Sequence, residues 1–255
     1  MSFIQVSDDS DVRIITLARP KANVLNLAMV EELLSAVHAA REDSQVRAVV
    51  VASNQPGFFS TGFDVVEVFD YDRNAMRHFF RRFLDLFNET LHMPKAVIGG
   101  IRGHAYAGGA FLAVAFDQRV FAEGSTGFAL NEINFGAVLP SIIRHALINI
   151  VGAHQAARII LSGEKVSPAE AHKIGLADVL VQEDQVLPAS VALAHQFAAK
   201  PPSAFAISKQ ALQSDFALSG PSESLDLFID QWFSPECSEL RQALTQSLKS
   251  KSAPQ

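Results

Sequence analysis

Apolar positions follow two different periods along the first part of the chain. Val12–Leu17 is a largely β-branched, apolar run, which is typical of a strand, and Arg19 and Pro20 end it. Leu27–Arg41 carries apolar residues at helical spacing. Val46–Ala52 is a short continuous apolar run and predicts a strand buried on both faces. The chain therefore begins with strands and helices in alternation.

The alternation continues through the middle of the chain. Met76–Leu91 has aromatic and aliphatic residues at i, i+3 and i+4 spacing, which predicts an amphipathic helix that stops before Pro94. Further strands are predicted for three short apolar runs, Ala96–Ile101, Gln118–Ala122 and Ala177–Val181. Further helices are predicted at Ile142–Val151, Gln155–Leu161 and Pro168–Ile174.

The C-terminal part differs from the rest, because from Pro188 onward the pattern predicts helices only. We interpret residues 1–190 as an α/β core that carries the functional site, and residues 191–255 as a helical region for oligomerisation. Five apolar residues of this region recur at near-helical spacing: Leu225, Phe228, Ile229, Trp232 and Phe233. Such a surface is too apolar to leave in water, so a trimer or hexamer is expected.

Composition and charge narrow the classes of function. The 255 residues are 49% hydrophobic and carry a net charge of -6, which argues against nucleic acid as a partner. A single cysteine, Cys237, excludes an internal disulfide and makes a reducing cytoplasm the expected compartment. Neither a signal peptide nor an apolar run of roughly 20 residues is visible, so a soluble protein without a membrane partner is expected. The histidines show no metal-ligand pairing, and no metal is expected.

Two glycine-containing segments are candidates for binding a developing negative charge. In Gly57–Asp64, small residues form a sharp bend where a backbone N–H can approach a ligand closely; an ordinary turn capped by Asp64 is the competing interpretation. In Gly103–Phe116, two adjacent glycines precede an apolar helix, and unshielded N–H groups at such a place can hold an oxyanion or a phosphate. Close packing of a helix on a strand would explain the same glycines.

A third segment, Phe128–Gly136, holds one carboxylate, Glu132, in an otherwise apolar run. Burial penalises the charged form of a carboxyl group, so its pKa would rise towards values useful for proton transfer. An exposed Glu in a loop remains the alternative. Two backbone donors and one carboxylate would together suffice for enolate chemistry at a thioester.

These segments resemble the crotonase (enoyl-CoA hydratase/isomerase) superfamily. Phe59–Asp64 is similar to the family's first oxyanion signature, F-S/C-A-G-x-D, and Gly103–Asp117 to its second, G-x-A-x-G-G-G-x-x-L-x-x-x-x-D. Three further stretches match in order, Arg19–Asn26, Gly163–Asp178 and Ser208–Leu212, so that the resemblance covers roughly residues 12 to 212.

The resemblance implies a spiral of ββα units with a helical C-terminal region, assembled as a trimer or a dimer of trimers. It implies an acyl-CoA thioester as substrate, with coenzyme A as part of that substrate and no separate cofactor. The N–H groups of Thr61 and Gly108 would form the oxyanion hole. Coenzyme A would lie along the Arg19–Ala22 loop, where Lys21 and Ala22 are candidate contacts.

Coenzyme A would also lie along the bend at Gly62, Phe63 and Asp64.

Hydratases of the family use two glutamates. The position of the first is Phe111 here, while Glu132 matches the second. The Δ3,Δ2-enoyl-CoA isomerases of the family show a similar pattern, with an apolar residue at the first position. We therefore expect an isomerase that shifts the double bond of a 3-enoyl-CoA with Glu132 as its single base.

Three alternatives stay open. A hydratase or another enolate enzyme would need a second acid that the pattern does not identify, and Asn134 is included among the possibilities. A decarboxylase or C–C hydrolase needs the oxyanion hole but fewer acids. A degenerate CoA-binding protein is the alternative without catalysis.

The stripe of Phe79, Phe80, Phe83 and Phe87 is interpreted as core, with the wall of an acyl pocket as a rival interpretation.

Overall fold

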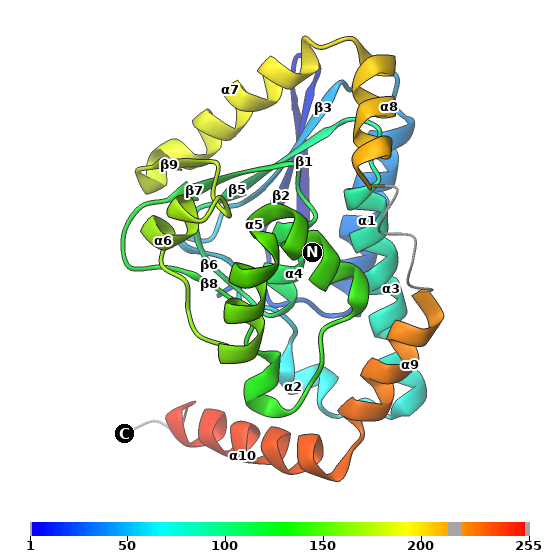
Figure 1. The fold of residues 1–255 in the computed structure, drawn as a ribbon, viewed down its shortest axis with the longest axis vertical. Helices are drawn as coiled ribbons and strands as arrows, with labels where there is room; N and C mark the ends of the chain where they lie inside the picture. The colour runs from blue at the N-terminus through cyan, green and yellow to red at the C-terminus, as the bar shows by residue number, and fades with distance from the viewer. Residues whose placement is uncertain (1, 214–220, 253–255) are drawn as a thin grey trace.

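The structure is a computed structural model that describes residues 2–213 and 221–252, with the backbone alone for 221–224 and 247–252. Its strands form two sheets (Figure 1). The larger has the order β1 (Ile4–Asp9), β2 (Val12–Leu17), β3 (Ala48–Ser53), β5 (Ala96–Ile101), β7 (Gln118–Ala122) and β9 (Val179–Val181). The smaller has the order β4 (Gly57–Ser60), β6 (Gly103–Tyr106) and β8 (Phe128–Ala129). Only the β1–β2 pairing is antiparallel among these neighbours.

From β3 to β8, each turn of the chain contributes one strand to each sheet before a helix or helical turn follows. β3 and β4 lead to α2 (Val65–Val68) and α3 (Arg73–Leu91), and β5 and β6 lead to α4 (Gly108–Val114). β7 and β8 lead to a short 3-10 turn, Glu132–Phe135, and then to α5 (Ser141–Ser162). This repetition is the ββα spiral that the resemblance implied, so the predicted fold class is confirmed.

The remaining helices cover the two sheets. The first is α1 (Leu27–Glu42), whose N-cap Asn26 accepts a hydrogen bond from the Met29 N–H at 3.1 Å. α1 packs on α3, and α7 (Val186–Ala198) packs on the opposite side of the larger sheet. The others are α6 (Pro168–Lys173), a 3-10 turn at Glu183–Gln185, α8 (Pro202–Gln213), α9 (Pro221–Trp232) and α10 (Pro235–Ser252). Within the described ranges no helix combines the length and apolar character needed to cross a bilayer.

The buried strands and helices lie close to where the pattern predicts them. β3 is buried along its whole length, as a continuous apolar run requires. The two helices predicted around residue 152 form α5, in which Gly152 has a φ of 77° and interrupts the helical backbone. The pattern missed β1, whose residues are exposed after Ile4, and the short strands β4, β6 and β8. The predicted boundary at residues 190 and 191 falls inside α7.

Four of the five residues of the apolar stripe in the C-terminal region are buried within the single chain, and Phe233 is half-buried. Leu225, Phe228, Ile229 and Trp232 are each at most 4% exposed within the single chain. α9 lies against α3, where the ring of Phe228 stacks on that of Phe80 at 3.6 Å. Because other parts of the same chain cover most of the stripe, its apolar character gives no reason to expect a subunit interface there. A trimer or hexamer remains a prediction that rests on the family resemblance.

The close approach of β4 and β6 generates a prediction about stability. A Cβ on Gly103 would lie 1.9 Å from the carbonyl carbon of Gly57, a backbone atom that no rotamer change can move away. Gly103→Ala is expected to lower the free energy of unfolding by about 3 kcal/mol. Gly100→Ala, whose Cβ would meet the Ser190 hydroxyl at 3.1 Å, is the control and is expected to cost less than about 1 kcal/mol. Urea unfolding measures both, and equal losses would contradict the described β4–β6 contact.

Candidate active site

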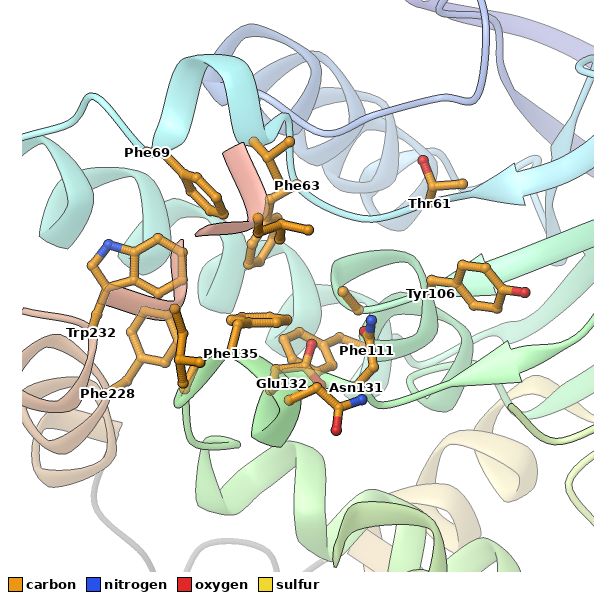
Figure 2. Close-up of a pocket in the computed structure, with 16 residues that line it drawn as sticks. Thr61, Phe63, Phe69, Tyr106, Phe111, Asn131, Glu132, Phe135, Phe228 and Trp232 are labelled. Atoms are coloured by element: carbon orange, nitrogen blue, oxygen red, sulfur yellow. The ribbon is translucent and has the colours of Figure 1, made fainter. Parts of the chain in front are cut away.

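A cavity of about 300 Å³ lies between the smaller sheet and the C-terminal helices (Figure 2). Four segments far apart in the sequence line it. They contribute Thr61, Phe63, Val65 and Phe69; Tyr106, Ala107 and Phe111; Asn131, Glu132, Asn134, Phe135 and Ala137; and Phe228, Trp232, Leu240 and Leu244. The lining is mostly apolar, and Glu132 is its single charged residue.

The bend after β4 touches the start of α4 so closely that glycine is required on both sides. Gly62 has a φ of 92°, and a Cβ there would lie 3.0 Å from the Gly108 nitrogen. A Cβ on Gly108 would lie 2.5 Å from the ring of Phe63, and one on Gly109 would lie 2.3 Å from the Ser60 carbonyl oxygen. The two glycine-containing segments predicted to act together are therefore brought into direct contact.

The backbone donors at this contact differ from those predicted. The Thr61 N–H donates to the Ala22 carbonyl at 3.1 Å, and the Gly62 N–H donates to the Ser60 hydroxyl at 3.2 Å. Within the described part of the chain, the N–H groups of Phe63 and Gly108 donate no hydrogen bond. The prediction for Gly108 is compatible with this arrangement, whereas the Thr61 N–H is already engaged. No donor role was predicted for the Phe63 N–H, since the hydrogen bond that engages Thr61 joins it to the distant Ala22 and leaves no local signal in the sequence.

Glu132 begins the 3-10 turn and is 3% exposed. Its Oε2 is buried without a hydrogen-bond partner among the described residues. Removal from water raises the pKa of Glu132 from the ordinary 4.5 to about 8, and a hydrogen bond from its own backbone N–H offsets only part of that effect. The carboxyl group is therefore protonated in most molecules at neutral pH and titrates in the range useful for proton transfer.

Phe111 lies in the first turn of α4 and is fully buried. Its ring lies 6.1 Å from that of Phe63 and 6.0 Å from that of Phe83, in tilted or edge-on arrangements. The ring of Phe63 also makes edge-on contacts with Phe79 and Phe80 of α3. The aromatic stripe of α3 thus belongs to the core, as predicted, and it supports the bend from behind.

Two asparagines flank the carboxyl group. Asn134, the candidate second acid, lines the cavity and donates from its side-chain nitrogen to the Gly163 carbonyl at 3.2 Å. An amide has no proton to give as an acid at neutral pH. Asn131, to which the sequence analysis assigned no role, also lines the cavity, and its Oδ1 is buried without a partner in the described residues.

The candidate coenzyme A contacts stabilise the bend or lie at the surface. Asp64 forms an ion pair with Arg19 at 2.6 Å, and Arg19 also donates to the Val24 carbonyl. Ala22 accepts the hydrogen bond of Thr61 described above, and Lys21 is exposed with a φ of 77°. None of Lys21, Ala22 and Asp64 is among the residues that line the cavity.

Comparisons with known proteins agree on one family. The sequence profile of the enoyl-CoA hydratase/isomerase family matches residues 8–229. The mitochondrial enoyl-CoA delta isomerase 1 of Rattus norvegicus is 28% identical over 185 residues, which are 72% of this chain and 64% of the rat protein. This chain therefore spans less than two thirds of that relative. A probable enoyl-CoA hydratase of Bacillus subtilis is 31% identical over 217 residues, 84% of this chain and 83% of that protein.

Solved structures show the same fold. The human mitochondrial Δ3-Δ2-enoyl-CoA isomerase superposes with a TM-score of 0.93 at 24% identity, over 98% of this chain and 100% of that one. An enoyl-CoA hydratase/isomerase from Xanthobacter autotrophicus Py2 superposes with a TM-score of 0.84 at 27% identity, over 100% of this chain and 99% of that one. With the family profile covering most of its length, the chain belongs to the enoyl-CoA hydratase/isomerase family.

Proposed function

We propose that the cavity binds an acyl-CoA thioester and converts a 3-enoyl-CoA into the 2-enoyl isomer, with Glu132 as its single acid/base. The observation that carries this proposal is one buried carboxyl group whose Oε2 has no hydrogen-bond partner among the described residues. The other polar side chains that line the cavity are two asparagines, a threonine and a tyrosine. Moving a double bond needs a proton removed at one carbon and returned at another, which one group can do in turn.

The reaction would proceed through a dienolate. The ionised Glu132 takes a proton from C2, and the electron pair of that C–H bond spreads over C2, C4 and the thioester oxygen. The protonated carboxyl then returns the proton to C4, which leaves the double bond between C2 and C3. A carboxyl group with a pKa of about 8 is a stronger base when ionised than one at the ordinary 4.5, and it still gives its proton back readily.

The developing charge on the thioester oxygen needs donors that are free before substrate arrives. We assign this role to the N–H groups of Phe63 and Gly108, because both lack an acceptor and the bend holds them close together. The Thr61 N–H would first have to leave the Ala22 carbonyl, so Thr61 serves the bend as a positioning residue. Fixed donors of this kind cost no reorganisation during the reaction.

Coenzyme A would extend from the Thr61 end of the cavity along the Arg19–Ala22 loop. Lys21 is exposed there and is the proposed partner of a coenzyme A phosphate. The ion pair between Arg19 and Asp64 would keep this loop against the bend while substrate binds.

Hydration is the alternative, and one observation favours it. The unpartnered Oδ1 of Asn131 could hold a water molecule close to Glu132. Against it stands Phe111, which puts an apolar ring where a hydratase of the family would have its other glutamate. A decarboxylase or C–C hydrolase would use the same two N–H donors without needing a second acid.

The first prediction separates these reactions by their rates on matched substrates. The protein is expected to isomerise a 3-enoyl-CoA much faster than it hydrates the 2-enoyl product. Glu132→Gln is expected to lower isomerisation by about 10²–10⁴, while Glu164→Gln at an exposed position is the control and keeps full activity. Chromatography of the CoA products measures both rates. Hydration as fast as isomerisation would show that a second acid acts at the site, and inactivity on both substrates would favour the decarboxylase or C–C hydrolase.

The second prediction follows from the pKa of Glu132, which burial raises to about 8. The base is the ionised form, so kcat/KM for isomerisation should rise about tenfold per pH unit below this pKa and level off above it. The measurement is initial rates between pH 5.5 and 9.5, where the fold is monitored by circular dichroism. A profile that is flat from pH 6 upward would mean that the carboxyl group ionises at an ordinary pKa.

The third prediction distinguishes the backbone donors. Replacing Phe63 by phenyllactate turns its N–H into an ester oxygen and keeps the ring, which should lower kcat by about 10²–10³. The equivalent α-hydroxy acid at Thr61 removes only the hydrogen bond to Ala22 and should cost less than about tenfold. Equal losses at both positions, or a larger loss at Thr61, would contradict the assignment of Phe63.

A further inference from the structure

The cavity continues beyond Glu132 and ends at three aromatic rings. Figure 2 shows Thr61 and Tyr106 at one end of the view, Glu132 in the middle, and Phe69, Phe228 and Trp232 at the opposite end. The ring of Trp232 lies 5.6 Å from that of Phe69 and 5.6 Å from that of Phe228. We call Phe69, Phe228 and Trp232 the end wall.

The end wall is anchored to the rest of the molecule. Phe228 stacks on Phe80 of α3 with an interplanar angle of 3°, and Phe80 in turn contacts Phe63 of the bend. The guanidinium group of Arg241 lies 4.6 Å from the centre of the Trp232 ring and donates to the Trp232 carbonyl at 3.0 Å. Trp232 is only 2% exposed, and Phe69, Phe228 and Arg241 pack around its indole. The wall is therefore a fixed stop for whatever enters the cavity.

The chemistry of this end is apolar. The end wall itself carries one polar group, the Nε1–H of Trp232, which is buried without an acceptor among the described residues. The other polar side chains of the lining lie away from the end wall, at the bend after β4, at the end of β6 and at the 3-10 turn with its N-cap: Thr61, Tyr106, Asn131, Glu132 and Asn134. Arg241 lies beside the Trp232 ring and does not line the cavity. A charged group carried to the end wall would still lose its water without gaining a charged partner in the lining.

The volume of the cavity limits the length of the acyl chain that it can hold. At about 30 Å³ for a group the size of a water molecule or a methylene, about 300 Å³ holds on the order of ten such groups, including the thioester carbonyl. We propose that the end wall restricts the acyl group to an uncharged chain of roughly eight to ten carbons and that Trp232 sets this limit. The inference rests on the proposed function only in taking the ligand to be an acyl-CoA thioester.

Binding of saturated acyl-CoA thioesters tests the limit apart from any reaction. Dissociation constants for chains of four to sixteen carbons are measured by titration calorimetry, with free coenzyme A as the reference. Affinity is expected to rise by up to about fourfold per methylene as far as eight to ten carbons, and then to stop rising or fall. A steady rise to sixteen carbons would overturn the proposed limit. Binding of none of the thioesters would instead refute the proposed function.

Variants identify the residue that sets the limit. Trp232→Ala is expected to move the optimum by about three carbons towards longer chains, because truncation leaves a cavity in place of the indole. Trp232→Phe keeps an aromatic ring and should move it less, which provides the test if the alanine variant does not fold. Phe233→Ala is the matched control, since Phe233 neighbours Trp232 without lining the cavity. An unchanged optimum in a folded Trp232 variant would overturn the assignment.

A chain that ends in a carboxylate tests the apolar character of the end wall. Octanoyl-CoA and the mono-CoA thioester of octanedioic acid are long enough to reach the end wall and differ only in that end group. The carboxylate is expected to weaken binding at least about tenfold, because no charged partner lines the far end. Tighter binding of the carboxylate would overturn the proposal of an uncharged acyl group and would point to Arg241 as its partner.

Discussion

The contact between the bend after β4 and the start of α4 is the constraint on which the site depends. Gly62, Gly108 and Gly109 each face an atom that lies closer than a Cβ would tolerate, and in the case of Gly109 that atom is the Ser60 carbonyl oxygen. Any side chain here would separate two segments that lie more than forty residues apart in the sequence. The separation would move apart the N–H groups of Phe63 and Gly108, which are left without an acceptor in the described structure. The aromatic rings of α3 hold Phe63 from behind, so the core and the site share one set of contacts.

The second feature of the site is a carboxyl group that lowers stability. Because the pKa of Glu132 is raised in the folded state, the unfolded chain ionises first as the pH rises above 4.5. Stability is fully present below that value, falls as the pH rises towards about 8, and is lower by about 5 kcal/mol above it. Burial of Glu132 therefore destabilises the folded protein at high pH, whereas an exposed glutamate would have no such effect. Aromatic rings in contact with one another run from Phe63 through Phe80 to Phe228 and Trp232 along the cavity that holds Glu132.

Long, regular patterns were enough to predict much of the fold. The continuous apolar run of β3 and the i, i+3, i+4 spacing of α3 are local signals, and the structure has both elements. The strands β4, β6 and β8 are two to four residues long, and their pairing partners are distant in sequence, so no local pattern marks them. For the same reason the sequence could not show that the Thr61 N–H is engaged, since its partner is the Ala22 carbonyl. The stripe on α9 was correctly seen as apolar, yet sequence alone could not tell a subunit interface from packing on α3 within one chain.

Apolar burial is what raises the pKa of Glu132, and the proposed chemistry depends on that raised value. The most direct test is a pH titration of the Glu132 carboxyl carbon by NMR on protein labelled with ¹³C-glutamate, with Glu132→Gln used to assign the signal. The account predicts a midpoint near pH 8, because burial raises the pKa of Glu132 to about 8. A midpoint near 4.5, the ordinary value, would show that water or an unrecognised partner reaches the carboxylate and would contradict the account.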